Sequence, residues 1–312
     1  MKPVRKPVIK RIGIIIITAL AIYTAVSFTA TKLIYDGIFA RFDSRDSVPQ
    51  ALESMVTQRI QKEYICGDNR LTGYLYRSGE GTSLVVLAPG FHASADDYLW
   101  QIQSLLEYGW SVFAFDPTGS CDSGGDSAVG FSQALLDLEA TLAYIESQDR
   151  FGCEDILLFG HSRGGYAACC ALRSDYDIAA VVSISGINSP MDGIMAAATE
   201  QVGLLAYGNY GFLWLYETML FGADIVNYTA EQAISESNVP VLVVQGSNDR
   251  RAPADRYSIY SKKEAIRSDR TEYLLCSQPE QDGHSNLLFD GSGGANGALM
   301  AKIHGFYLKS IS

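Results

Sequence analysis

The chain has 312 residues, of which 47% are hydrophobic, and a formal net charge of -11. This length and apolar content are enough for one large globular domain and exclude a disordered chain. The acidic balance argues against a nucleic-acid-binding surface, so we expect no nucleic-acid partner.

The N-terminus combines a basic segment with a long apolar one. Residues 1–11 carry five cations and no acidic residue, and the 20 residues from Ile12 to Thr31 carry no charge. At about 1.5 Å per residue, such a helix crosses the ~30 Å hydrocarbon core of a bilayer. A cleaved signal peptide, with an apolar region of about 7 to 15 residues, is the alternative. We predict an uncleaved transmembrane signal-anchor helix at 12–31, or secretion if the segment is cleaved.

Charge on either side of this segment predicts its orientation. Only Lys32, Arg41 and Arg45 follow it closely. The positive-inside rule therefore places residues 1–11 in the cytoplasm and the rest of the chain outside the cell membrane. Residues 32–60 carry mixed charge and a helical tendency, and we interpret them as a stalk.

The body, residues 61–312, begins with two predicted strands around the turn at 67–69. Short runs that are apolar on both faces then alternate with segments of helical spacing, which is typical of an α/β fold with a mostly parallel central sheet flanked by helices. The predicted strands are 83–90, 111–116, 155–160, 179–186, 239–246 and 271–276, and the predicted helices between them include 96–109, 131–148 and 163–174.

A long insertion interrupts this alternation at about 187–236, far beyond the length of a normal connection. We predict that it forms a helical cap. Its large apolar side chains either line an acyl pocket or pack the cap onto the body. They are Leu204, Leu205, Tyr207, Tyr210, Phe212, Trp214, Tyr216, Met219, Leu220 and Phe221.

The stretch LLFGHSRGGYAACC, residues 157–170, places Ser162 between a predicted strand and a small-residue helix. A G-x-S-x-G pattern in this context predicts a nucleophile on a sharp turn. Gly160 and Gly164 fit this role because the strained turn leaves no room for Cβ atoms beside it. Cys169 and Cys170 are expected to pack on the helix; the other cysteines show no metal or redox spacing, and their pairing cannot be deduced.

This elbow resembles that of the α/β-hydrolase family, in which an acid and then a histidine follow the serine, each after a later strand. Asp249 follows the strand VPVLVVQG, and His284 follows the strand TEYLLC. The resemblance therefore implies a catalytic triad of Ser162, Asp249 and His284. Asp255 is a nearby alternative for the acid, or a helix cap.

The other three histidines have different expected places. His161 lies inside the elbow and points away from the serine hydroxyl, His92 belongs to an early loop, and His304 sits in a helical pattern where a packed or solvated ring is expected. The resemblance implies an oxyanion hole made by the backbone N–H groups of Phe91 and Arg163. Where many members of the family have His-Gly in this loop, the chain has Pro-Gly.

Taken together, the resemblance implies a serine hydrolase that cleaves an acyl bond, most readily a carboxylic ester, through an acyl-enzyme. A serine peptidase or amidase and a non-catalytic membrane-bound binding protein are the alternatives. We expect a small acyl substrate with an apolar group. The sequence lacks the motifs of a metal site, a P-loop or a dinucleotide site, so no cofactor or metal is predicted.

Overall fold

The computed structural model describes residues 6–43, 48–79 and 82–311. Its centre is an eight-stranded sheet in the order β1-β2-β4-β3-β5-β6-β7-β8. The strands are β1 (Ile60–Cys66), β2 (Asn69–Tyr76), β3 (Ser83–Ala88), β4 (Ser111–Asp116), β5 (Asp155–His161), β6 (Ile178–Ile184), β7 (Val241–Gly246) and β8 (Thr271–Cys276).

Strand direction divides the sheet into two parts. The pairs β1/β2 and β2/β4 are antiparallel, and every other neighbouring pair is parallel. Each predicted strand begins and ends within two residues of an observed strand. Where the bounds differ, the apolar run of the sequence usually extends one or two residues beyond the observed strand. The predicted α/β-hydrolase fold class is confirmed.

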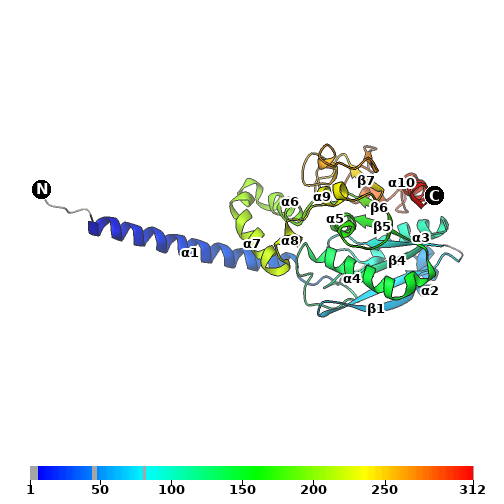
Figure 1. Ribbon diagram of the computed structural model, residues 1–312, viewed down its shortest axis with the longest axis horizontal. Coiled ribbons are helices and arrows are strands. Elements are labelled where there is room, and N and C mark those ends of the chain that lie inside the picture. The colour runs from blue at the N-terminus through cyan, green and yellow to red at the C-terminus, as the bar shows by residue number, and fades with distance from the viewer. Residues whose placement is uncertain (1–5, 44–47, 80–81, 312) are drawn as a thin grey trace.

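Helices cover both faces of this sheet (Figure 1). Side chains of α4 (Gln133–Ser147), α5 (Arg163–Cys170) and α9 (Ala230–Glu236) pack in one core layer, and those of α3 (Leu99–Glu107) and α10 (Gly297–Ile311) pack in the other. Along β3, Leu84 and Val86 face the first layer while Val85 and Leu87 face the second. A strand buried on both faces explains why its sequence is apolar at every position.

Helix α1 (Lys6–Ile38) is one continuous helix of 33 residues that leaves the body as a long rod (Figure 1). Its segment Lys10–Ile38 is long and apolar enough to cross a membrane, by length and composition. The membrane span at 12–31 remains a prediction that this helix accommodates.

Residues 32–60 differ from the predicted stalk. The last turns of α1 dock on the body, where Tyr35 and Phe39 are 2% and 4% exposed. Lys32 pairs with Asp36 one turn further on, so the mixed charge stays on one side of the helix while the aromatic side is buried. After a short stretch, α2 (Glu53–Gln58) follows Leu52, which is also buried. The described residues 32–43 and 48–60 thus pack on the body, where Tyr35 meets Tyr216 of the insertion and Phe39 meets Phe91 of the loop after β3.

The inserted cap consists of α6 (Pro190–Val202), a 3-10 segment (Gly203–Asn209), α7 (Tyr210–Phe221) and α8 (Ala223–Val226). Figure 1 shows these elements gathered where α1 reaches the body. The last part of the predicted insertion is α9, whose Ala230, Ala233 and Ile234 are buried in the core layer that also holds α5. This helix therefore belongs to the body. Cys169 and Cys170 are buried on α5 with free thiols.

Candidate active site

Ser162 lies at the turn between β5 and α5, with backbone angles φ 55° and ψ -116°. A positive φ is costly for a residue with a Cβ and persists only where neighbours hold it. Here the N–H of Ser162 donates to Ile184 O at 2.8 Å, and its carbonyl accepts from Gly165 N at 3.0 Å and Tyr166 N at 3.2 Å. The turn thus fixes the serine side chain at the carboxyl end of the central strand.

The glycines of the motif are required by close backbone approach. A Cβ on Gly160 would collide with the carbonyl of Gly164, and a Cβ on Gly164 would collide with the carbonyl of Ala88 at the end of β3. The elbow therefore packs directly against the loop that follows β3.

Three side chains from three loops meet at the same edge of the sheet, because β5, β7 and β8 are parallel. The Oγ of Ser162 lies 2.8 Å from Nε2 of His284. Nδ1 of His284 lies 2.8 Å and 3.0 Å from the two carboxylate oxygens of Asp249. Since a carboxylate can only accept, Nδ1 carries the hydrogen and Nε2 accepts the serine hydroxyl proton.

Asp249 is held as an ionised, buried carboxylate. Burial by itself raises the pKa of this carboxyl, but hydrogen bonds from His284, the Ala252 backbone and the Gln245 amide outweigh it, so the pKa lies below its ordinary value. The Ala252 N–H donates at 2.8 Å and the Gln245 Nε2 at 3.0 Å. Asp255, the alternative acid, is exposed, and His284 hydrogen-bonds to Asp249 instead.

The two backbone N–H groups of the implied oxyanion hole come from the elbow and from the loop after β3. Neither the N–H of Phe91 nor that of Arg163 donates to another residue in the described part of the chain. A Cβ on the preceding Gly90 would lie 3.4 Å from Cβ of Ser162, so this loop runs close beside the serine despite its Pro-Gly sequence. Both N–H groups of the predicted oxyanion hole are thus without a protein acceptor among the described residues.

The side chain of Arg163 connects the turn at Ser162 to the residues before α4. Its guanidinium is buried and donates to the carbonyls of Phe131 at 3.0 Å and Gly130 at 2.8 Å. It also lies 5.7 Å from the Phe91 ring centre. Burial lowers the pKa of this guanidinium to about 10, which leaves it charged near neutral pH. The residue therefore ties the elbow to the loop before α4.

His161 forms a hydrogen-bond relay that the sequence did not reveal. Its Nδ1 accepts from the hydroxyl of Tyr98 at 2.8 Å, that hydroxyl accepts from Gly90 N at 2.9 Å, and Nε2 donates to the backbone carbonyl of His284 at 3.0 Å. Burial, followed by the charge of nearby His284, lowers the pKa of His161 to about 3, so the ring is neutral near pH 7. The relay joins the loop after β3 to the loop that carries His284.

The remaining histidines lie away from the reacting groups. His304 accepts from Trp110 Nε1 at 3.1 Å and stacks on Tyr108, as expected for a packed ring. His92 donates from Nε2 to the carbonyl of Ile38, the last residue of α1, at 3.2 Å. The loop after β3 is therefore also joined to the end of the N-terminal helix.

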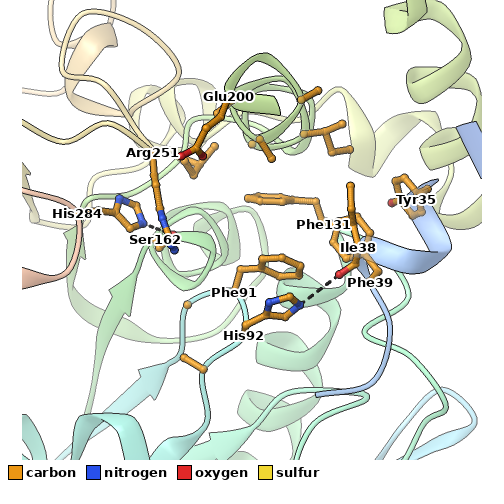
Figure 2. Close-up of a pocket in the computed structure, with 18 of the residues that line it drawn as sticks. Tyr35, Ile38, Phe39, Phe91, His92, Phe131, Ser162, Glu200, Arg251 and His284 are labelled. Atoms are coloured by element: carbon orange, nitrogen blue, oxygen red, sulfur yellow. Dashed lines mark hydrogen bonds between the residues drawn. The ribbon is translucent and has the colours of Figure 1, made fainter. Parts of the chain in front are cut away.

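A cavity of about 610 Å³ extends from the serine. Figure 2 shows Ser162 and His284 on one side of it and Tyr35, Ile38 and Phe39 on the other. The rings of Phe91 and Phe131 lie between them (Figure 2). The cavity is large enough for a small-molecule ligand and is mostly apolar away from the serine.

The cap contributes to this cavity differently from the sequence prediction. Cap residues in its wall are small or of moderate size, chiefly Ile194, Ala196, Ala197, Ala198 and Leu213. The large apolar residues proposed for an acyl pocket are absent from the wall among the described side chains, and Leu205 lies outside these. Most of them face α1, the body or the exterior. Among the described residues of α7, Leu213 is the one that lines the cavity.

Two charged residues and the end of α1 complete the wall and were missed by sequence reasoning. Glu200 of α6 and Arg251 of the Asp249 loop line the cavity. Arg251 directly follows the acid loop SNDR, a signal that could have been noticed, whereas no sequence pattern places α1 beside the serine. No group of three or more His, Cys, Asp or Glu that could hold a metal ion occurs within residues 6–43, 48–79 and 82–311.

Comparison with known proteins agrees with this geometry. Residues 79–206 match a family model described as serine aminopeptidase, S33. An esterase from Pyrococcus furiosus has a TM-score of 0.66 at 17% identity, covering 88% of this chain and 100% of its own. Est1E from Butyrivibrio proteoclasticus, with ferulic acid bound, has a TM-score of 0.60 at 18% identity, covering 80% and 99%. The chain therefore has the α/β-hydrolase fold.

The family match spans Ser162 and ends before Asp249 and His284. This α/β-hydrolase is also similar to an acylaminoacyl peptidase from Pyrococcus horikoshii, with a TM-score of 0.57 at 14% identity over 81% of this chain and 41% of that one. No curated protein sequence matches the chain. The α/β-hydrolase is thus an esterase-like or peptidase-like hydrolase.

Proposed function

We propose that this α/β-hydrolase cleaves carboxylic esters through Ser162 as nucleophile, His284 as base and Asp249 as the group that orients the imidazole. The observation that carries the proposal is the unbroken hydrogen-bonded series from Ser162 Oγ to His284 and on to the buried carboxylate. A serine hydroxyl is a weak nucleophile, and this arrangement supplies the base that it needs.

The reaction follows from these positions. Nε2 of His284 takes the hydroxyl proton while Oγ of Ser162 attacks the acyl carbon, and the N–H groups of Phe91 and Arg163 receive the developing oxyanion. The imidazolium returns its proton to the departing alkoxide, which leaves an acyl-enzyme. Water then attacks the acyl carbon with the same base, and Ser162 is released with the free acid.

The choice of an ester rests on the apolar cavity and on the esterase among the similar structures. The second candidate, a serine peptidase or amidase, is favoured by the description of the matching family model. The leaving group distinguishes them, because an amine must be protonated before it departs whereas an alkoxide leaves more readily.

Fluorophosphonate labelling of the full-length protein tests the nucleophile. We expect one adduct on Ser162, located by peptide mass spectrometry, and none in Ser162→Ala, whose ester turnover should fall by at least about 10³-fold. A panel of matched ester and peptide substrates then separates the two candidates by kcat/KM. A folded protein that neither labels nor turns over any ester or peptide would favour the binding-protein alternative.

We further propose that α1 anchors the enzyme in the cell membrane with the hydrolase body outside the cytoplasm. The support is the uncharged stretch from Ile12 to Thr31 and the five cations before it. In right-side-out membrane vesicles, the body should stay bound to the membrane before protease is added. Added protease should then degrade it. If the body is protected from the protease, the orientation is the opposite of the one proposed. If the body is released from the vesicles without protease, the N-terminal segment has been cleaved.

A further inference from the structure

We propose that the active-site cavity takes its substrate from the lipid bilayer, and that this substrate is a long-chain acyl ester whose chain lies along α1. The inference rests on the proposed serine hydrolase function and names its substrate class. It follows from the position of one helix that belongs both to the predicted membrane span and to the wall of the cavity.

The cavity wall includes one stripe of α1. The lining residues Ala30, Thr31, Ile34, Tyr35 and Ile38 recur at intervals of three or four, so they lie on a single face of the helix. This stripe begins within the last turn of the uncharged stretch and ends where the chain enters the body. The α1 end of the cavity is therefore at the level where the hydrocarbon of a bilayer would end.

The same end of the cavity is open. Ile34 is 58% exposed although it lines the cavity, and Ala30 is also exposed. Across from them, Ala197 of α6 lines the cavity and is exposed as well. The opening between α1 and the cap is thus lined by apolar side chains on α1 and by Ala197 on α6, with the exposed carboxylate of Glu200 one turn further along α6. A water-soluble, polar substrate gains nothing from such an opening, whereas an acyl chain can pass through it without leaving apolar surroundings.

The cap runs beside the part of α1 that is predicted to be in the membrane. Phe212 of α7 packs edge-on against Tyr23, with ring centres 6.1 Å apart, and Tyr216 packs against Phe28 at 6.0 Å. Tyr216 also donates from its hydroxyl to Asp36 at 2.8 Å. Because Phe28 and Tyr23 lie three and eight residues before Thr31, about 5 and 12 Å along the helix, this part of α7 would enter the outer half of the bilayer.

The outer surface of the cap fits that position. The only charged residue of α7, Glu217, is buried, and the surface carries exposed large apolar side chains. Exposed apolar side chains next to a predicted membrane span favour insertion into the bilayer interface. The exposed residues are Leu204, Tyr207, Tyr210, Leu215, Met219 and Leu220.

The catalytic end is connected rigidly to this opening. His92 donates to the last carbonyl of α1 and Phe39 packs on Phe91, with ring centres 5.1 Å apart. The loop that offers the Phe91 N–H is therefore held by the helix that lines the opening. An acyl chain lying between α1 and Phe91 would place its ester carbon at Ser162, with its polar group on the side of Arg251 (Figure 2).

The test uses full-length protein reconstituted in phosphatidylcholine vesicles that contain monoolein, with p-nitrophenyl acetate as the soluble ester. Ile34→Trp narrows the opening, and Leu33→Trp adds the same bulk at the neighbouring position, which is 68% exposed and outside the cavity wall. Both sites are exposed enough to accept the larger ring without strain in a packed core.

We expect the ratio of monoolein turnover to acetate turnover to fall about tenfold or more in Ile34→Trp and to stay within about twofold in Leu33→Trp. An unchanged ratio in Ile34→Trp, or an equal fall in both variants, would overturn the inference. If the unaltered enzyme labels with fluorophosphonate and hydrolyses the acetate but not monoolein, the inference fails while the proposed function stands. If it neither labels nor hydrolyses either ester, the proposed function itself fails.

Discussion

The Ser162 end of the cavity is polar and fixed by hydrogen bonds, whereas the α1 end is apolar and partly exposed. At the first end, each reacting group has a partner at 2.8–3.0 Å. At the second, helices pack through aromatic rings 4.9–6.1 Å apart, and the wall opens outward. The difference suggests a division of roles for the two proposals: the polar end would carry out the bond cleavage, and the apolar end would admit the substrate.

The largest expected effect concerns the polar end. Asp249→Asn should lower kcat for ester hydrolysis by about 10⁴-fold, because an amide in place of the carboxylate no longer holds the tautomer with hydrogen on Nδ1. Asp255→Asn is the matched control and should leave kcat within about twofold. Steady-state kinetics on p-nitrophenyl acetate measure both. Equal loss in the two variants would show that Asp249 is not the orienting acid.

The next effect concerns the relay that joins the two loops of the polar end. His161→Ala removes the donor to the His284 carbonyl and the acceptor for Tyr98, so we expect kcat to fall about 10- to 100-fold with little change in KM. His304→Ala, at a packed histidine distant from the serine, should leave both constants near their original values. A rise in KM with unchanged kcat would assign His161 to substrate binding instead of positioning.

A smaller effect is expected at the apolar end. Met219→Glu places a charge on the exposed surface of the cap and should lower turnover of vesicle-borne monoolein roughly three- to tenfold, since that surface no longer enters the interface readily. Ile65→Glu is the matched control, because Ile65 on β1 is 67% exposed and Met219 is 66% exposed. Similar turnover of monoolein in the two variants would show that the cap surface does not contact the membrane.

The smallest effect is a pH dependence of stability at Glu217, which connects the cap to the body. Its carboxyl accepts from Ser132 N at 2.9 Å and from Ser132 Oγ at 2.7 Å. Burial raises the pKa of Glu217 to about 8, above its ordinary value of 4.5. Between these two values the folded state holds a proton that the unfolded state releases, so this contribution to the free energy of unfolding is lost as the pH rises toward 8.

Glu217→Gln removes that dependence. As the pH rises from about 5 to 8, the Tm of the variant should rise relative to that of the original protein, by up to about 2 °C per pH unit. Thermal unfolding at pH 5, 6, 7 and 8 measures it. A difference in Tm that stays constant over this range would mean that Glu217 does not titrate there.

Particular residues show which parts of the fold and of the candidate site could be predicted from the sequence. Continuous apolar runs located the strands because both faces of a parallel sheet are buried. The elbow glycines and the order of Ser162, Asp249 and His284 located a candidate site because strand ends of a parallel sheet meet at one edge. The relay through His161 and Tyr98 could not be predicted, because its partners come from separate segments of the chain that no sequence spacing relates.

The sequence by itself determined the strand pattern, the strained turn at Ser162 and a helix long enough to span a bilayer, because each depends on residues close together in the chain. Only the tertiary structure decided that residues 32–42 join the body, that the large apolar residues of α7 avoid the cavity wall, and that α1 lines it instead. Those outcomes depend on which surfaces meet, and an apolar face in the sequence does not reveal the distant partner against which it will be buried.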